Sequence, residues 1–152
     1  MKNAYNKIKK DFDLPDFDIL NYEFEIGDLD PAGFLLREIK RKINDKFSDA
    51  CELLSKLIQP EPTSLTELYE YRCFDDDAKK KIFELFSRII YLKRKINESE
   101  LLLDDKVDAA LIKEAADVWP DIRKQLIPFV KELTVCWENT PESDKEVKGY
   151  LG

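Results

Sequence analysis

The chain has 152 residues, enough for one domain with a core of its own, and a formal net charge of −7. It contains no histidine, which excludes Ser-His-Asp and Cys-His nucleophile systems and every His-ligated metal site. Its four glycines form no G-x-G-x-x-G or G-K-[ST] pattern, so Gly-rich phosphate-binding loops are excluded as well. The negative charge disfavours bulk binding to nucleic acid or to anionic membranes.

Three cysteines, Cys51, Cys73 and Cys136, are far apart in the sequence and form no C-x-x-C pair. An odd number without a metal-binding spacing favours reduced, mostly buried thiols. The first ten residues lack an apolar signal core, and no apolar run approaches the length of a membrane span. These observations predict an intracellular, cytoplasmic protein.

Residues 1–29 differ from the rest of the chain, and we expect them to form an N-terminal arm. A short amphipathic helix is predicted over Asn3–Phe12, ended by Pro15. Apolar residues then alternate with polar ones from Leu20 to Ile26, the period of a half-buried strand. Because no second run could pair with it, the pattern predicts an extended arm or a lone strand.

From Asp30 onward the pattern is helical. Asp30 is a good N-cap and Pro31 suits a first helical position, so a helix is predicted from there to Gln59. Its apolar residues recur every three or four positions, and its length would be about 42 Å at 1.5 Å per residue. A helix of this length predicts a multi-helix bundle organised around it.

Further helices follow. Ser64 and Glu67 form a capping box for a helix ending near Arg72, and the Asp75–Asp77 run caps one that frays near Glu98. Asp104 or Asp105 caps the next, which should end at Trp119, because Pro120 suits the start of a new helix. Pro128 predicts a kink or a further break. The expected fold is all-α, a bundle of about five or six helices over residues 30–138, followed by a polar tail at 139–152.

The arm supplies the leading functional prediction. It is too apolar for a disordered leader, and it either covers its own bundle or docks on a partner. The expected partner-binding residues are Phe12, Leu14, Phe17, Leu20, Tyr22, Phe24 and Ile26. Without a nucleophile–base pair or a phosphate loop, no catalytic residue and no cofactor are predicted. The chain is expected to be a non-catalytic interaction or assembly protein, either oligomeric or a subunit of a complex, with a protein partner, no membrane and no haem.

A first alternative rests on paired carboxylates. Glu67 and Glu70, and Glu114 and Asp117, each lie one helical turn apart, and four converging carboxylates could hold Mg²⁺. The pairs are similar in type to the E-x-x-E and E-x-x-D motifs of all-α nucleotide pyrophosphohydrolases. Such a resemblance implies a divalent-metal-dependent hydrolase, although the stretch between the pairs is much longer here than in that family.

A second alternative is a nucleic-acid-associated protein. Arg37, Lys40 and Arg41 could form a basic strip on the long helix, opposite its apolar stripe. Acidic residues interleave with these basic ones, which also favours local ion pairs on a solvated surface.

Overall fold

The computed structural model describes residues 1–139. Within that range the chain forms six α-helices and one short 3-10 helix, with no β-strand. In chain order they are α1 (Lys2–Phe12), α2 (Phe17–Phe24), η1 (Ile26–Asp28), α3 (Leu35–Ile58), α4 (Leu65–Arg72), α5 (Asp76–Leu102) and α6 (Asp105–Glu138). The prediction of an all-α multi-helix bundle is confirmed. The predicted polar tail lies, apart from Asn139, outside the described residues.

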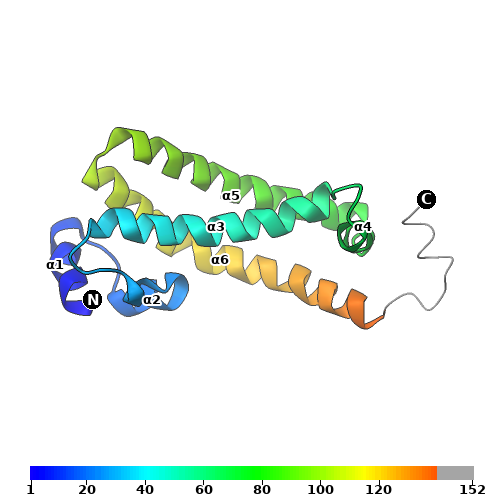
Figure 1. The fold of residues 1–152 in the computed structure, drawn as a ribbon, viewed down its shortest axis with the longest axis horizontal. Coiled ribbons are helices and arrows are strands. Elements are labelled where there is room, and N and C mark those ends of the chain that lie inside the picture. The colour runs from blue at the N-terminus through cyan, green and yellow to red at the C-terminus, as the bar shows by residue number, and fades with distance from the viewer. Residues whose placement is uncertain (140–152) are drawn as a thin grey trace.

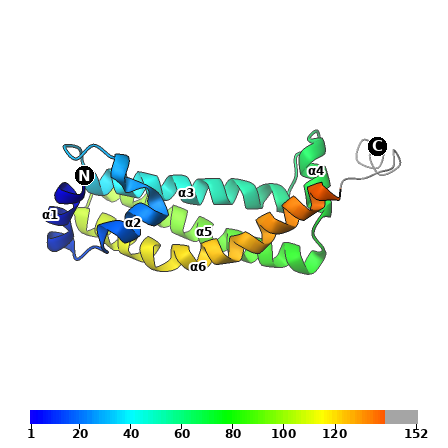
Figure 2. The ribbon, with the colours of Figure 1, turned by 90° about the horizontal axis from the view of Figure 1, so that it is seen from below.

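Three long helices, α3, α5 and α6, run side by side along the long axis of the molecule (Figure 1). Two short helices, α1 and α2, lie at the end where α3 begins, and α4 lies at the opposite end. Seen from below, α2 rests against α3 and α6 over part of their length only (Figure 2). The inner faces of the three long helices form one continuous apolar core.

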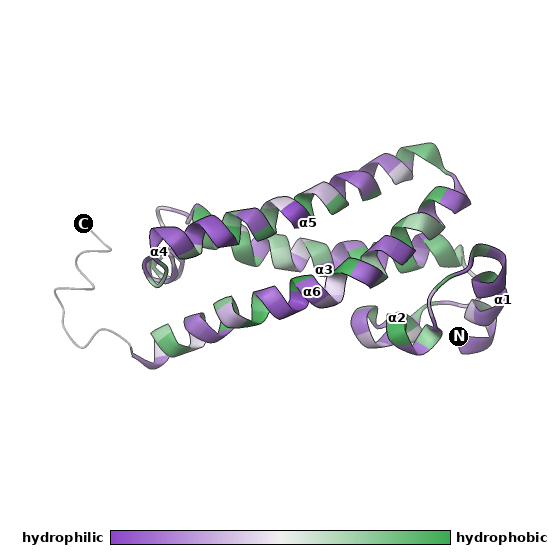
Figure 3. Ribbon diagram, turned by 180° about the vertical axis from the view of Figure 1, so that it is seen from behind, coloured by the Kyte–Doolittle hydropathy of each residue, from purple (hydrophilic) through white to green (hydrophobic). Residues whose placement is uncertain are grey.

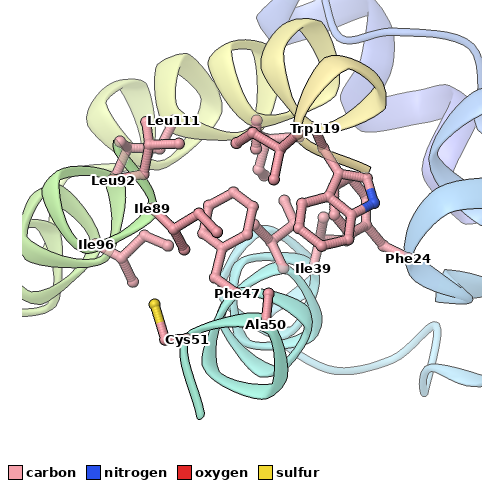
Figure 4. Close-up of a cluster of buried hydrophobic side chains, with 14 of the residues drawn as sticks. Phe24, Ile39, Phe47, Ala50, Cys51, Ile89, Leu92, Ile96, Leu111 and Trp119 are labelled. Atoms are coloured by element: carbon pink, nitrogen blue, oxygen red, sulfur yellow. The ribbon is translucent and has the colours of Figure 1, made fainter. Parts of the chain in front are cut away.

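Trp119 joins the long helices to α2. Its ring lies 5.5 Å from the ring of Phe47 on α3 and 6.2 Å from that of Phe24 on α2 (Figure 4). Two ion pairs flank this contact: Arg123 with Glu23 at 3.1 Å, and Lys46 with Glu25 at 3.2 Å. They attach the polar edges of α2 to α6 and to α3, so the buried side of α2 belongs to the core.

The predicted strand over residues 20–26 is wrong, because residues 20–24 belong to α2 and Ile26 begins η1. Phe17, Leu20 and Phe24 also recur at steps of three and four, so the sequence fits both periods. A helix satisfies its backbone hydrogen bonds locally, whereas a strand needs a neighbour that this part of the chain does not offer. Tertiary packing on Trp119 then favours the helix.

Two predicted helix boundaries are also wrong. Asp30 caps a turn rather than a helix: its carboxylate accepts a hydrogen bond from the backbone of Ala32 at 2.9 Å, and α3 begins only at Leu35. At the other boundary α6 continues through Pro120 and Pro128 and curves along its length (Figure 2). Each proline removes one helical hydrogen bond, a loss that burial of apolar side chains on the inner face of α6 offsets.

Three predicted caps are confirmed. The side chains of Ser64, Asp75 and Asp104 accept hydrogen bonds from the backbone of Glu67, Ala78 and Lys106, at the starts of α4, α5 and α6. Caps can be predicted from the sequence because each involves residues only two or three positions apart and does not depend on tertiary packing.

The end of the bundle that carries α4 is cross-linked. Cys73 and Cys136 form a disulfide with their Cα atoms 6.2 Å apart, while Cys51 is a buried free thiol. The Tyr69 hydroxyl donates a hydrogen bond to the carbonyl oxygen of Cys136 at 2.6 Å, and the Trp137 indole donates one to Glu70 at 3.0 Å. The prediction of three reduced cysteines is therefore wrong for Cys73 and Cys136, whose proximity depends on the packing of α4 against α6.

Candidate interaction surface

The turn between α5 and α6 lies at the opposite end of the bundle from α4 (Figure 1). α5 ends at Leu102, and the C-cap residue that follows it, Leu103, has a left-handed backbone with φ 52° and ψ 42°. The Leu103 N–H closes the helix by donating to the Ser99 carbonyl at 3.3 Å. This position favours glycine, because the Cβ of any other residue crowds the backbone there. A leucine at this place is therefore less favourable for the turn than a glycine.

Three consecutive leucines form the surface of this turn. Leu101, Leu102 and Leu103, which we call the leucine tip, are 84%, 55% and 66% exposed. The ribbon changes from hydrophobic at the end of α5 to hydrophilic at the start of α6, where Asp104 and Asp105 follow (Figure 3). Burying a leucine side chain contributes about 1.5–3 kcal/mol, so the tip leaves considerable binding free energy unused. A clustered apolar patch of this kind is typical of an interaction site.

A buried ion pair holds the tip in place. The Lys40 ammonium, on α3 and only 2% exposed, lies 2.7 Å from the Asp108 carboxylate of α6, which is also buried. The same nitrogen lies 3.3 Å from the carboxylate of Glu100 on α5. One lysine thus links α3 to both sides of the α5–α6 turn. Because charges removed from water require a close partner, this contact fixes the turn relative to α3.

A groove of about 400 Å³ opens beside the tip. It is lined by α1, by the segment that leads into α3, by the first turn of α3 and by the first residue of α6: Ala4, Lys7, Ile8, Phe12, Pro31, Gly33, Phe34, Leu35, Leu36, Arg37 and Asp105. Phe34 is 74% exposed, and the Arg37 guanidinium lies 5.1 Å from its ring centre. The groove and the tip meet at Asp105, so they belong to one end of the molecule.

Two basic residues and one acidic residue, Asp105, line the groove, whereas only acidic residues directly follow the tip. Lys7 and Arg37 line the groove, and neither forms an ion pair with any other part of residues 1–139. Asp104 and Asp105 follow the leucines directly. We call the leucine tip, Phe34 and this groove together the apolar end.

The structure places most of the predicted partner-binding residues inside the molecule. Leu14, Leu20, Phe24 and Ile26 are buried, and Phe12 and Phe17 are partly buried against the core. Tyr22, at 76% exposed, is the one side chain of this set that is open to solvent, and Arg123 lies over its ring. While the arm is packed as observed, the four buried side chains cannot contact a partner.

The four carboxylates of the metal alternative are not brought together. Glu70, on α4, accepts a hydrogen bond from Trp137 near the end of α6. Glu114 lies 23 residues earlier on α6, a separation of about 34 Å along a helix. Its carboxylate binds Lys95 at 2.6 Å, and this hydrogen bond raises the pKa of Lys95. Glu67 belongs to the α4 pair and Asp117 to the α6 pair. No cluster of acidic or cysteine residues suited to a metal ion occurs within residues 1–139.

The basic strip is interrupted as well. Lys40 is buried against Asp108, so its predicted role at a nucleic-acid surface is wrong. Arg41 pairs with Glu38 at 2.7 Å, and Arg37 lies over Phe34. The sequence carries a signal for this outcome: Lys40 is four positions after Leu36 and three before Ile43, within the inward stripe of α3.

Sequence reasoning missed the apolar end. Its signal was the run of three leucines directly before two aspartates, where the inward stripe of α5 leaves Leu101 and Leu102 out of phase. Phe34 gave no comparable signal, because the sequence predicted a helix from Asp30 that includes Phe34. In the structure, α3 begins only at Leu35.

No protein-family model, curated protein or solved structure matches the chain. In the described part of the chain, no helix combines the length and apolarity needed to span a membrane.

Proposed function

We propose that this chain is a non-catalytic interaction or assembly protein that binds its partner through the apolar end. The observation that carries the proposal is the leucine tip, whose side chains are exposed on a turn fixed by a buried ion pair. A turn serving only as a connection is expected to be polar and to place glycine at the left-handed position. The choice of leucine instead favours binding over local stability.

The surface is also pre-organised. Lys40 ties the turn to α3, and Phe34 and the groove lie alongside it. A partner that covers the tip therefore does not have to order a loose loop first, which lowers the entropic cost of binding. The acidic residues beside the leucines would select a partner with a basic rim.

Site-specific photocrosslinking tests the proposal. A photoreactive residue replaces Leu102 in one preparation and Tyr91 in the other, an exposed α5 residue about 16 Å away along the helix. Each is irradiated in an extract of the source cells. We expect adducts of discrete mass from position 102 and none from position 91. The adducts should be lost when the photoreactive residue at position 102 is carried by a chain in which Leu101 and Leu103 are changed to serine.

Equal labelling at the two positions, or no adduct at position 102, would contradict the proposal. Adducts that persist when Leu101 and Leu103 are serine would do the same, because they would show that the label reacts without a specific complex.

We keep the cytoplasm as the proposed compartment, and the disulfide gives its test. Structural disulfides are typical of oxidising compartments, whereas cytosolic thiols are kept reduced. Rapid alkylation of thiols in intact cells measures which state the pair has there. Cys73 and Cys136 found reduced would support the cytoplasm and would mean that the disulfide forms only after the cells are opened. An oxidised pair under the same conditions would place the protein in an oxidising compartment instead.

A further inference from the structure

The apolar end carries both a projecting apolar group and an apolar groove, and the two are adjacent. The tip exposes three leucines followed by Asp104 and Asp105, and the groove is largely apolar, with two bases, Lys7 and Arg37, against one acid, Asp105, in its lining. A group that fills the groove well would be apolar and flanked by negative charge. The leucine tip has this chemistry.

Within one chain the tip cannot enter its own groove. Both lie at the same end of the bundle, Asp105 connects them, and Lys40 fixes the turn through Asp108 and Glu100. A two-fold rotation relating two chains end to end would instead bring each tip to the groove of the other copy. Such an interface is self-complementary, because the same contact forms twice.

From this complementarity we infer that the partner is a second copy of this chain, joined end to end through reciprocal insertion of each leucine tip into the other copy's groove. The inference rests on the proposed function of the apolar end and names its partner. Each of the two contacts between a tip and a groove, which we call a seam, joins apolar surface to apolar surface. It also pairs Asp104 or Asp105 of one copy with Lys7 or Arg37 of the other. The charges set the register, and the leucines and Phe34 supply the buried area.

Sedimentation velocity over a range of concentrations tests the inference. We expect the wild-type chain to form a dimer, and Leu102→Ser to weaken dimerisation by about 100-fold or more, since one substitution removes a buried leucine from both seams. Phe34→Ser should also weaken it. Tyr91→Ser is the matched control, an exposed apolar residue away from the apolar end, and should leave the dimer unchanged. Thermal unfolding of each variant reports whether it is folded.

A charge swap between two chains sharpens the test. Lys7→Glu places two acids opposite each other in both seams, and Asp105→Lys places two bases there, so each variant alone should be monomeric. In an equal mixture, one seam pairs the new glutamate with the new lysine and the other pairs the original lysine with the original aspartate. The mixture should therefore form a heterodimer.

A dimer that persists in Leu102→Ser, or a mixture that stays monomeric, would overturn the inference. A wild-type chain that is monomeric throughout would overturn it too. If position 102 still crosslinks specifically to a different protein, the proposed function stands without this partner. If position 102 gives no specific adduct at all, both fall.

Discussion

The two ends of the bundle are held together by different interactions. At the apolar end, one buried lysine between two carboxylates holds the α5–α6 turn, and α1 and α2 complete the core. At the other end, a disulfide and two hydrogen bonds attach α4 to the last turns of α6. The first end is fixed by a buried contact and still exposes leucines, whereas the second is fixed at its surface.

This difference shows how the residues that stabilise an end of the bundle can be distinct from those available for binding. A covalent cross-link at the α4 end stabilises the fold whether or not that surface is used. At the apolar end the stabilising contact lies beneath the surface, so the side chains above it are free to serve a partner. The exposed leucines therefore do not reflect a poorly formed turn.

The largest expected effect comes from removing the buried ion pair beneath the leucine tip. Lys40→Met leaves the Asp108 carboxylate buried without a cation, and we expect a loss of about 3–5 kcal/mol in the free energy of unfolding. Urea denaturation measures it. The double variant Lys40→Met/Asp108→Leu should regain most of that loss, since it removes both charges. A single variant as stable as wild type would show that the pair is not needed to hold this end.

The next effect concerns the α4 end. Cys73→Ser/Cys136→Ser opens a cross-link between residues 63 positions apart, and we expect a loss of about 2–4 kcal/mol in the free energy of unfolding, because the unfolded chain regains conformational freedom. Urea denaturation under oxidising conditions measures the change. Reducing the wild-type chain should reproduce it.

The free thiol provides the control for that experiment. Burial raises the pKa of Cys51, so the native oxidised chain should not react with a thiol reagent, and the unfolded oxidised chain should react at Cys51 alone. Reaction at Cys73 or Cys136 in the native oxidised chain would contradict the disulfide.

A smaller change sharpens the contrast between stability and binding. Leu103→Gly places the residue that the left-handed conformation favours at the end of α5, and we expect a gain of about 1 kcal/mol in the free energy of unfolding. The same variant should weaken the dimer. Leu101→Ser, where the backbone is helical, should weaken the dimer with little change in stability. A destabilised Leu103→Gly would show that this leucine supports the fold.

The smallest expected effect is a pH dependence on the flank of the bundle. The hydrogen bond from Arg88 lowers the pKa of the exposed Asp121 carboxyl. A folded-state pKa below the unfolded value stabilises the protein above the unfolded value, near 3.8, and this contribution disappears as the pH falls further. Arg88→Gln should therefore reduce the acid sensitivity of thermal unfolding slightly. Arg94→Gln is the control, because Arg94 hydrogen-bonds the amide of Asn97, which does not titrate.

Sequence alone determined the helical class, the long helices α3 and α5 and the caps at Ser64, Asp75 and Asp104, because these depend on residues within one or two turns of each other. It did not determine whether residues 20–26 form a strand or a helix, because their apolar pattern fits both periods. The surface that Trp119 and Phe47 provide in the folded protein selects the helix. Nor did it determine whether α6 breaks at Pro120, where the local cost of proline is outweighed by packing along the whole helix.

Tertiary structure alone decided the candidate site. The contact of Lys40 with Asp108 and Glu100, the proximity of Cys73 to Cys136, and the groove beside Phe34 all join residues far apart in the chain. The sequence of each segment shows which charged and apolar side chains are available. Which of them are buried, and which residues they contact, depends on how α3, α5 and α6 pack. For this reason a lysine predicted to bind nucleic acid lies in the core, and three leucines that the helical pattern left unexplained form the surface through which we propose the protein assembles.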